Sequence, residues 1–143
     1  MIDQDSINIL GYNIYGGKED DFSDGYSGVI CTINPHSYII SLTDRNFSEA
    51  LKNCDALLPD GTGIVLASRI LAGRRIKRIT GSDIHRILIS YLDRTKGSCF
   101  YFGSGQHTLN KVKERLEIER PHVNAGFLSP PFKPSFTKEE NLS

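Results

Sequence analysis

The chain has 143 residues, which is the size of one domain and enough to bury a hydrophobic core. Lysine plus arginine and aspartate plus glutamate both number 17, so the formal net charge is zero. Without a global field to attract nucleic acid or an anionic membrane, we expect no nucleic-acid partner.

The N-terminus is acidic and its apolar run is short, so we expect neither a signal peptide nor a transmembrane span. No run approaches the roughly 18 apolar residues that a span needs, and any membrane role is therefore expected to be peripheral. The three cysteines, Cys31, Cys54 and Cys99, are widely spaced and form no CxxC pair. This pattern favours buried thiols in a reducing cytosol over a disulfide framework or a zinc site.

Turn residues divide the first part of the chain into short apolar runs. β-branched runs that stop at turn residues predict strands, and a proline or an aspartate just before an apolar stripe predicts a helix start. The predicted elements are a hairpin at 7–17, an acidic, turn-rich surface loop at 18–25, a buried strand at 27–34, a helix beginning at Pro35, a second helix capped by Asp44, and a strand at 54–59.

The second part alternates helices and strands. Its strongest helical stripe runs from Ile84 to Leu92, with apolar residues at the spacing of one helix face. The predicted elements are a helix from Gly61 that stops at Gly73, a short strand or turn at 75–80, a helix capped by Ser82, a strand at 98–102, a helix at 108–119 and a strand at 122–129.

This order predicts an α/β fold: a Rossmann-like, mostly parallel sheet with helices on both faces, preceded by a short N-terminal hairpin. We expect one domain covering residues 1–143. Ligands of such sheets bind at the carboxyl ends of strands. Three loops are expected at such ends: Thr32–Pro35, Pro59–Gly63 and Gly103–Gln106.

Asp60 stands in the sequence "LLPDGTGIV", between a predicted buried strand and a predicted helix. A lone carboxylate there is either a helix cap or a chemical reagent, and the sequence alone leaves the two interpretations nearly even. The flanking Gly61 and Gly63 favour the reagent, because glycine lets backbone or ligand approach closely.

Three other side chains are candidates for the same site. Thr32 and Asn34 are two apart at a strand end and should point the same way, although Asn-Pro is also a common turn opener. Arg78 lies between Ile76 and Ile79 in an apolar alternation, and its fork of donors suits a diphosphate. The neighbouring cations of this stretch are more typical of a solvated face.

The sequence "FGSGQHT" places Gly103, Ser104, Gly105 and Gln106 between a strand and a helix, which suits phosphate binding. Tight-turn glycines are about as good an explanation, and the full dinucleotide fingerprint is absent. Asp3 and Asp5 form an acid-x-acid pair in a segment expected to fray, and the histidines lack metal-ligand spacing, so no metal site is expected. His36 beside its turn is more typical of a structural residue than of a base.

Five segments together resemble the WecG/TagA/CpsF family of bacterial glycosyltransferases, and its capsular-polysaccharide branch most closely. They are "TINPHS", "NCDALLPDGTGIV", "RITGSD", "CFYFGSG" and "GFLSPPFKPSFTKEEN", and they keep the order and spacing of the family. The resemblance runs from about Ile7 to the last residue.

The resemblance implies an inverting, metal-independent enzyme without a cofactor that works in cell-surface polysaccharide synthesis, such as capsule or teichoic acid. It would move an N-acetylhexosamine, its uronic acid or a hexose from a UDP-sugar to a polyprenyl-diphosphate-linked saccharide. The implied location is the cytoplasm, at the inner face of the membrane, with a possible homo-oligomer. Asp60 would be the general base, Thr32 and Asn34 would line its pocket, and Arg78 would balance the leaving diphosphate. The residues implied to contact nucleotide or substrate are Pro35, Gly61, Thr62, Gly63, Thr80, Gly81, Asp83, Gly103, Ser104, Gly105 and Gln106.

The family pattern usually continues beyond this length, with further α/β units and a basic C-terminal segment that touches the membrane. We therefore expect that the C-terminal portion of the family is missing from these 143 residues. The usual helix before the "TIN" strand is replaced here by the loop at 18–25. Two alternatives follow: an inactive remnant that still binds a nucleotide sugar, and a scaffold subunit whose exposed sheet edge pairs with a partner chain.

Overall fold

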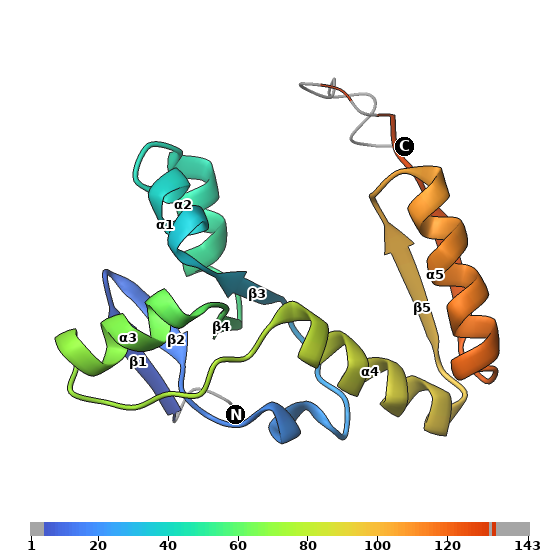
Figure 1. Ribbon diagram of the computed structural model, residues 1–143, viewed down its shortest axis with the longest axis horizontal. Helices are drawn as coiled ribbons and strands as arrows, with labels where there is room; N and C mark the ends of the chain where they lie inside the picture. Colours follow the sequence, from blue (N-terminus) through green and yellow to red (C-terminus); the bar gives the residue numbers. More distant parts are fainter. Residues whose placement is uncertain (1–4, 132, 134–143) are drawn as a thin grey trace. The chain divides into compact units, whose positions relative to one another are not determined.

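The structure is a computed structural model that describes residues 5–131 and 133 (Figure 1). The chain divides into two compact units, the first ending at Tyr91 and the second beginning at Leu92. The described residues form a mixed α/β protein, as predicted, and the single-domain organisation stays a prediction. Asp3 and most of the last part of the family-like segment "GFLSPPFKPSFTKEEN", from residue 132 on, lie outside the described residues.

The predicted N-terminal hairpin is confirmed. Strands β1 (Ser6–Ile9) and β2 (Tyr12–Tyr15) are antiparallel, with Ile7 opposite Ile14. Leu10 and Gly11 form the turn, both with positive φ. The alternate residues Ile7, Ile9, Tyr12 and Ile14 are buried, and they anchor the hairpin in the first hydrophobic cluster.

Strands β3 (Ile30–Ile33) and β4 (Ala56–Pro59) form a parallel pair in which Ile33 lies opposite Pro59. One face of this pair, with Cys31, Ile33 and Leu57, packs against apolar residues of the hairpin and of three helices within residues 35–71. The other face, with Ile30, Ala56 and Leu58, packs against a longer helix that begins at Gly81. Both faces of the pair are therefore covered by helices, as the near-continuous apolar runs predict.

The helices on the first face begin where the sequence places their caps. They are α1 (Pro35–Ser41), α2 (Arg45–Lys52) and α3 (Thr62–Leu71). Asp44 accepts a hydrogen bond from the Phe47 backbone N–H at 2.9 Å, and Pro35 takes the first position of α1. Gly73, with φ of +64°, follows the end of α3, as the glycine-stop prediction requires.

Residues 18–25 are more than the predicted surface loop. A 3₁₀ helix, Glu19–Phe22, exposes Asp20 and Asp21 but buries Phe22 completely. The Phe22 ring meets those of Tyr15 and Tyr26 edge-on, at centroid distances of 5.4 and 5.3 Å. The prediction missed this anchor because a single apolar residue among acids has no periodic pattern.

Helix α4 (Gly81–Thr95) is the predicted apolar-striped helix, with Ile84 and Ile89 buried. Its expected cap, Ser82, is wrong: the helix already begins at Gly81, and the capping bonds involve Thr80 and Asp83. Residues 75–80 are not assigned to a strand, although the Ile79 N–H donates to the Pro59 carbonyl at 3.0 Å.

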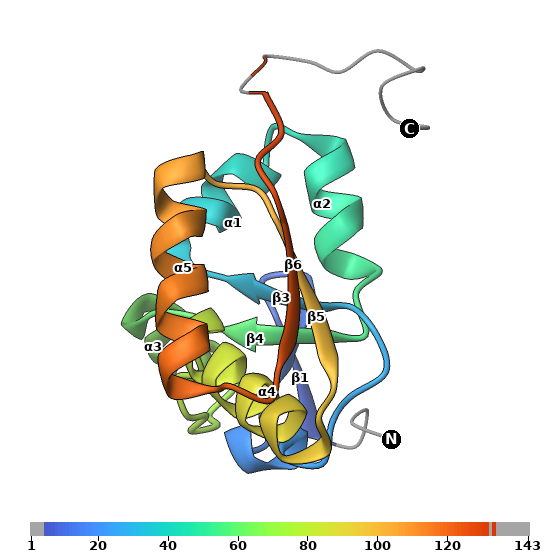
Figure 2. The same cartoon turned by 90° about the vertical axis from the view of Figure 1, so that its right-hand side faces the viewer.

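The second unit contains strands β5 (Ser98–Phe102) and β6 (Asn124–Leu128) and helix α5 (Gln106–Glu119) between them (Figure 2). The two strands are parallel over their full length, which is the arrangement expected of a strand-helix-strand unit. Tyr101 and Phe127 stack on each other at a centroid distance of 5.2 Å.

Hydrogen bonds join the described strands in three pairs, β1–β2, β3–β4 and β5–β6. The parallel α/β class is confirmed, and one continuous Rossmann-like sheet stays a prediction. All three cysteines are half-buried free thiols. In the part of the chain that the structure describes, no helix has both the length and the apolar character required to cross a membrane.

Candidate functional site

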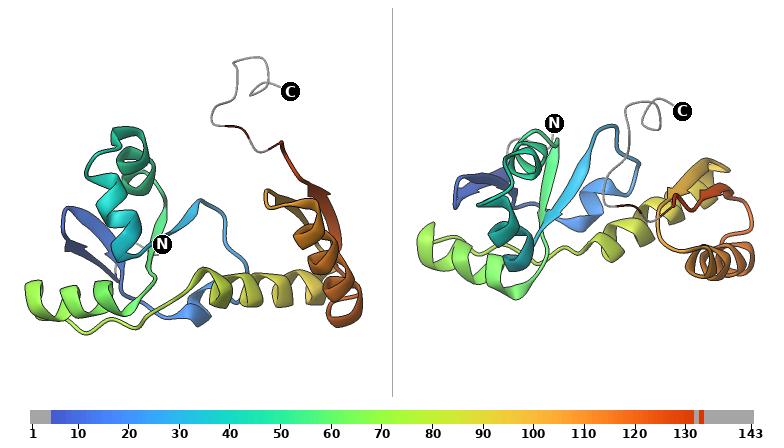
Figure 3. Two further views of the ribbon diagram at one scale, coloured as in Figure 1. Left: turned by 45° about the horizontal axis from the view of Figure 1, so that its top comes forward. Right: turned by 90° about the horizontal axis from the view of Figure 1, so that it is seen from above.

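The carboxyl ends of β3 and β4 lie side by side in the first unit (Figure 3). The Asp60 N–H donates to the Ile33 carbonyl at 2.9 Å. Asn34 and Asp60, the first residues after β3 and β4, therefore lie side by side. On the other side of β4, the bond from Ile79 to Pro59 brings the segment that carries Arg78 and Thr80 to the same edge. We call this cluster of loops the β3–β4 edge. It contains Thr32, Asn34, Pro35, Asp60, Gly61, Thr62, Gly63, Arg78, Thr80, Gly81 and Asp83.

Asp60 is half-buried at this edge. Helix α3 has Gly61 as its N-cap, so Asp60 precedes the cap position and the capping interpretation is wrong. Within residues 5–131 and 133, the Asp60 carboxylate makes no hydrogen bond or salt bridge. A half-buried carboxylate that stabilises no backbone group of its own protein is available to a ligand.

The two glycines after Asp60 have different structural tasks. Gly61 has φ of +118°, which L-residues rarely adopt, although a methyl group there would have room, 3.6 Å from Pro35 Cδ. A Cβ on Gly63 would lie only 2.5 Å from Pro35 Cγ. Gly63 therefore allows the start of α3 to pack closely against the start of α1. The close approach at Gly63 is thus between two segments of the chain.

Gly61→Ala should lower the free energy of unfolding by about 1–3 kcal/mol, because the backbone conformation alone disfavours a side chain there. Urea denaturation of the whole chain measures the effect. Gly81→Ala is the matched control, because a Cβ there would make ordinary contact, 3.8 Å from Thr32 Cγ2. Equal stability of both variants and the wild type would contradict the assignment of strain to Gly61.

Asn34 has a structural role in addition to any contact with a ligand. Its side-chain oxygen accepts from the Ser37 N–H at 2.9 Å, and the Ser37 hydroxyl accepts from the Asn34 N–H at 2.8 Å. This reciprocal capping box starts α1, as the turn-opening interpretation of Asn-Pro expects. Thr32 is half-buried on the preceding strand, next to Gly81.

Thr80 and Asp83 form a second reciprocal cap, at the start of α4. The Asp83 carboxylate accepts from the Thr80 hydroxyl at 2.7 Å and from the Thr80 N–H at 2.9 Å. These two bonds hold the pKa of Asp83 below its usual range, and the charges of Arg86 and Arg78 lower it further. Arg78 itself is exposed.

Asp83→Asn should destabilise the first unit by about 1 kcal/mol at neutral pH, because the neutral amide is a weaker cap. Since folding lowers the pKa of Asp83, the wild type has the full contribution above the ordinary pKa of 3.8 and loses it as the pH falls through the lower folded value. Urea denaturation between neutral and acidic pH should show the gap between wild type and variant closing at the acidic end. A gap that is constant with pH would contradict the capping role.

The loop Gly103–Gln106 belongs to the second unit, at the carboxyl end of β5. Gly103 and Ser104 have positive φ, of 112° and 67°, and Gly105 is the N-cap of α5. A Cβ on either glycine would meet nothing within 4 Å. The start of α5 thus has the open, glycine-lined form that suits an anion, and nucleotide binding there stays a prediction.

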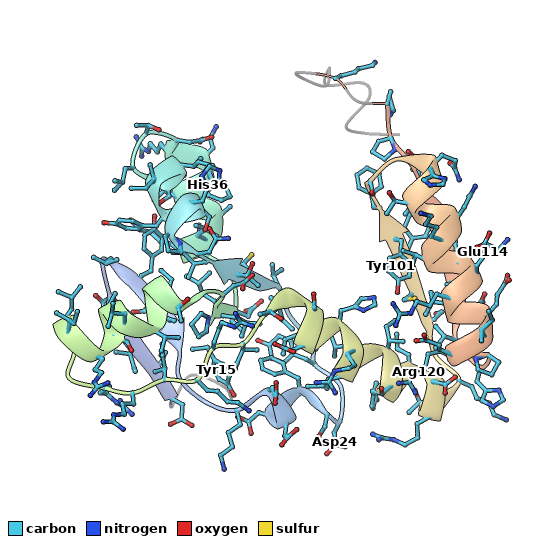
Figure 4. The ribbon with its side chains drawn as sticks, viewed as in Figure 1. Tyr15, Asp24, His36, Tyr101, Glu114 and Arg120 are labelled. Carbon is cyan, nitrogen blue, oxygen red and sulfur yellow. The ribbon has the colours of Figure 1, made fainter. Side chains whose placement is uncertain are left out.

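Two further predictions from the sequence concern His36 and metal ligands. His36 follows Pro35 in the first turn of α1 and is exposed (Figure 4). In residues 5–131 and 133, no three His, Cys, Asp or Glu side chains are grouped so that they could hold a metal ion. The expectation of metal independence stays a prediction.

The fold and the β3–β4 edge define an α/β protein with a polar loop cluster and an available carboxylate at the ends of parallel strands. The model of the WecG/TagA/CpsF glycosyl transferase family matches residues 8–143, and the chain belongs to this family.

Two curated relatives come from Bacillus. The protein of Bacillus subtilis (strain 168) is 30% identical over 100 residues, which are 69% of this chain and 39% of the relative. The protein of Bacillus spizizenii (strain ATCC 23059 / NRRL B-14472 / W23) is 28% identical over 99 residues, which are 68% of this chain and 38% of the relative. Both are named N-acetylglucosaminyldiphosphoundecaprenol N-acetyl-beta-D-mannosaminyltransferase. The matched region thus spans less than half the length of these relatives.

Proposed function

We propose that this chain carries the acceptor-activating part of a glycosyltransferase that moves a sugar from a UDP-sugar to a polyprenyl-diphosphate-linked saccharide. The observation that supports it most is the Asp60 carboxylate, half-buried and without a partner among the described residues, at the ends of two parallel strands. Family membership and the names of the two relatives support the acceptor class.

In the proposed reaction, Asp60 removes the proton of the acceptor hydroxyl. The hydroxyl oxygen then attacks the anomeric carbon of the donor sugar from the side opposite the leaving group, so the new bond has inverted configuration. The bond from the anomeric carbon to the diphosphate breaks, and UDP leaves with the electron pair. One carboxylate is sufficient for this displacement.

Negative charge develops on the departing diphosphate and needs stabilisation. The guanidinium of Arg78 and the N-terminal ends of α3 and α4 carry positive charge or partial charge at the β3–β4 edge. These groups support a reaction without a metal ion. Thr32 and Asn34 would position the sugar or the acceptor.

The proposal includes a cytoplasmic location at the inner membrane face, where a polyprenyl acceptor is accessible. We further propose peripheral contact through the C-terminal segment typical of the family, and formation of a homo-oligomer. The printed names of the relatives suggest N-acetylmannosamine as the sugar and an N-acetylglucosaminyl diphosphate lipid as the acceptor.

The direct test incubates the chain with UDP-N-acetylmannosamine and polyprenyl-diphosphate-N-acetylglucosamine. Release of UDP together with the disaccharide-lipid is the expected result, and EDTA should leave the rate unchanged. Because the match spans 39% of the Bacillus subtilis relative, the assay is repeated with the C-terminal part of that relative fused to the chain. UDP binding without transfer in both proteins would contradict the proposal and favour a binding remnant.

A further inference from the structure

Two of the three cysteines lie together in the first unit. Cys31 is the second residue of β3, and Cys54 stands two residues before β4 begins. Both side chains are half-buried and pack against the same hydrophobic cluster, which the hairpin and the helices on the first face of the β3–β4 pair complete. The backbone joins the two segments at this point, because the N–H groups of Asp55 and Ala56 both donate to the Val29 carbonyl, at 2.9 and 3.2 Å.

The thiols of Cys31 and Cys54 contact each other. The Cys54 thiol donates to the Leu51 carbonyl at 3.1 Å, which holds its sulfur beside the end of α2. Burial, the charge of Cys31 and a hydrogen bond with the Cys31 thiol together raise the pKa of the Cys54 thiol to about 11. A hydrogen bond between two thiols brings their sulfurs into contact. Cys31 and Cys54 are therefore a pair, whereas Cys99 belongs to the second unit.

A cavity of about 100 Å³ lies beside Cys54, between the hairpin, the end of α2 and the start of β4. Cys54 lines it together with the polar side chains of Asn13, Lys52 and Asp55. Because about 10–15 Å³ is enough for one water molecule, a small oxidant such as hydrogen peroxide has room in this cavity. The sulfur of Cys54 can thus be reached without opening the hydrophobic cluster.

We propose that Cys31 and Cys54 form a reversible disulfide when hydrogen peroxide is present, and that this disulfide is a redox switch of the β3–β4 edge. In the first step, the Cys54 thiol loses its proton and its sulfur attacks one oxygen of the peroxide. The O–O bond breaks, one water molecule leaves, and Cys54 becomes a sulfenic acid. The Cys31 sulfur then loses its proton and attacks the Cys54 sulfur, the S–O bond breaks, and a second water molecule leaves. Two thiols are oxidised by two electrons in total, and one peroxide is reduced to two water molecules.

The disulfide would act on the site through the two strands, and this step rests on the proposed function. Cys31 immediately precedes Thr32, and Cys54 begins the segment that leads through β4 to Asp60. Bond formation draws the two sulfurs from contact to about 2.05 Å, so β3 or the start of β4 has to move. Since a shift of about 1 Å in a catalytic group can cost roughly 100-fold in rate, the oxidised chain should transfer sugar more slowly. A reversible disulfide of this kind is also the usual redox-sensing form in a reducing compartment.

Peptide mass spectrometry of the full chain tests the disulfide directly. The reduced chain is freed of reductant, treated with hydrogen peroxide while folded, alkylated and digested. We expect a cross-linked peptide that joins Cys31 to Cys54 and is lighter by two hydrogens than the two thiol peptides. Dithiothreitol should restore all three free thiols.

Cys99→Ser is the matched control, because it removes the thiol of the second unit and should leave the cross-link unchanged. Cys54→Ser should form no cross-link, and circular dichroism confirms that each variant is folded. Cys31→Ala replaces it as the test where the serine variant does not fold. A cross-link that contains Cys99, a cross-link between two chains, or oxidation of Cys31 and Cys54 to separate sulfinic acids in the folded wild type would overturn the proposal.

The transfer assay tests the switch and separates it from the proposed function. Peroxide should slow transfer by the wild type by roughly tenfold to 100-fold, dithiothreitol should restore the rate, and Cys54→Ser should be insensitive to peroxide. A cross-linked chain that transfers sugar at the full rate would overturn the switch. A chain that transfers sugar but forms no cross-link would overturn this inference alone. A Cys31–Cys54 cross-link in a chain that never transfers sugar supports the disulfide, in which case only the proposed function fails.

Discussion

Asp60→Asn should lower the rate of sugar transfer by about 10²–10⁴-fold and leave the Kd for UDP-sugar nearly unchanged. The amide has the shape of the carboxylate but cannot accept the acceptor proton. Since the Asp60 carboxylate makes no hydrogen bond or salt bridge within residues 5–131 and 133, its replacement should cost little stability. Transfer assays and calorimetric titration of UDP-sugar measure the two effects.

Asp20→Asn is the matched control, because it removes one exposed carboxylate from the same unit. It should transfer sugar at the wild-type rate. If Asp60→Asn lost UDP-sugar binding or unfolded the chain, Asp60 would be a structural residue and the base would have to be another group. A wild-type rate for Asp60→Asn would contradict the proposed role equally.

Phe22→Ala should lower the free energy of unfolding of the first unit by about 3–5 kcal/mol. Phe22 is 0% exposed and packs with Ala56, Leu58, Ile79 and Ile84 in the second hydrophobic cluster. Removing the ring leaves a cavity between the 3₁₀ helix and the core, and it also removes two edge-to-face ring contacts. Urea denaturation followed by circular dichroism measures the loss.

Asp20→Ala changes an exposed neighbour in the same 3₁₀ helix and should stay within about 0.5 kcal/mol of the wild type. Phe22→Leu should lie between the two, because it keeps part of the buried volume. A Phe22→Ala variant as stable as the wild type would show that the loop at 18–25 is the surface loop that its composition predicts.

The elements with a local signature could be predicted from the sequence. The alternation in β1 and β2, the apolar runs of β3 and β4, the helix start at Pro35 and the cap at Asp44 all involve residues that are close along the chain. Whether each of these elements forms depends on backbone preferences and on one or two local hydrogen bonds. The prediction of Ser82 as the cap of α4 was wrong because Thr80 and Ser82 are both good caps, and only the hydrogen bonds to Asp83 distinguish them.

The gathering of candidate residues at one edge was predictable in part. Parallel strands end at a common edge, so Asn34 and Asp60 were expected to lie close together, and the register of Ile33 opposite Pro59 accounts for this. The close contact between Gly63 and Pro35 was not predictable, since it depends on how two helices pack. The roles proposed for the edge residues in binding and catalysis stay predictions.

The sequence by itself determined the α/β class, the order of the elements and the position of Asp60 at a strand end, because periodicity, caps and turn residues act over a few positions. Only the tertiary structure decided that Phe22 is a core residue, that Asp60 caps no helix and that Leu66 and Ile70 face outward. Contacts between segments far apart in the chain decide whether a side chain is buried and whether a carboxylate accepts a hydrogen bond. A pattern of residue types along one segment contains no information about which of its apolar side chains a distant partner will cover.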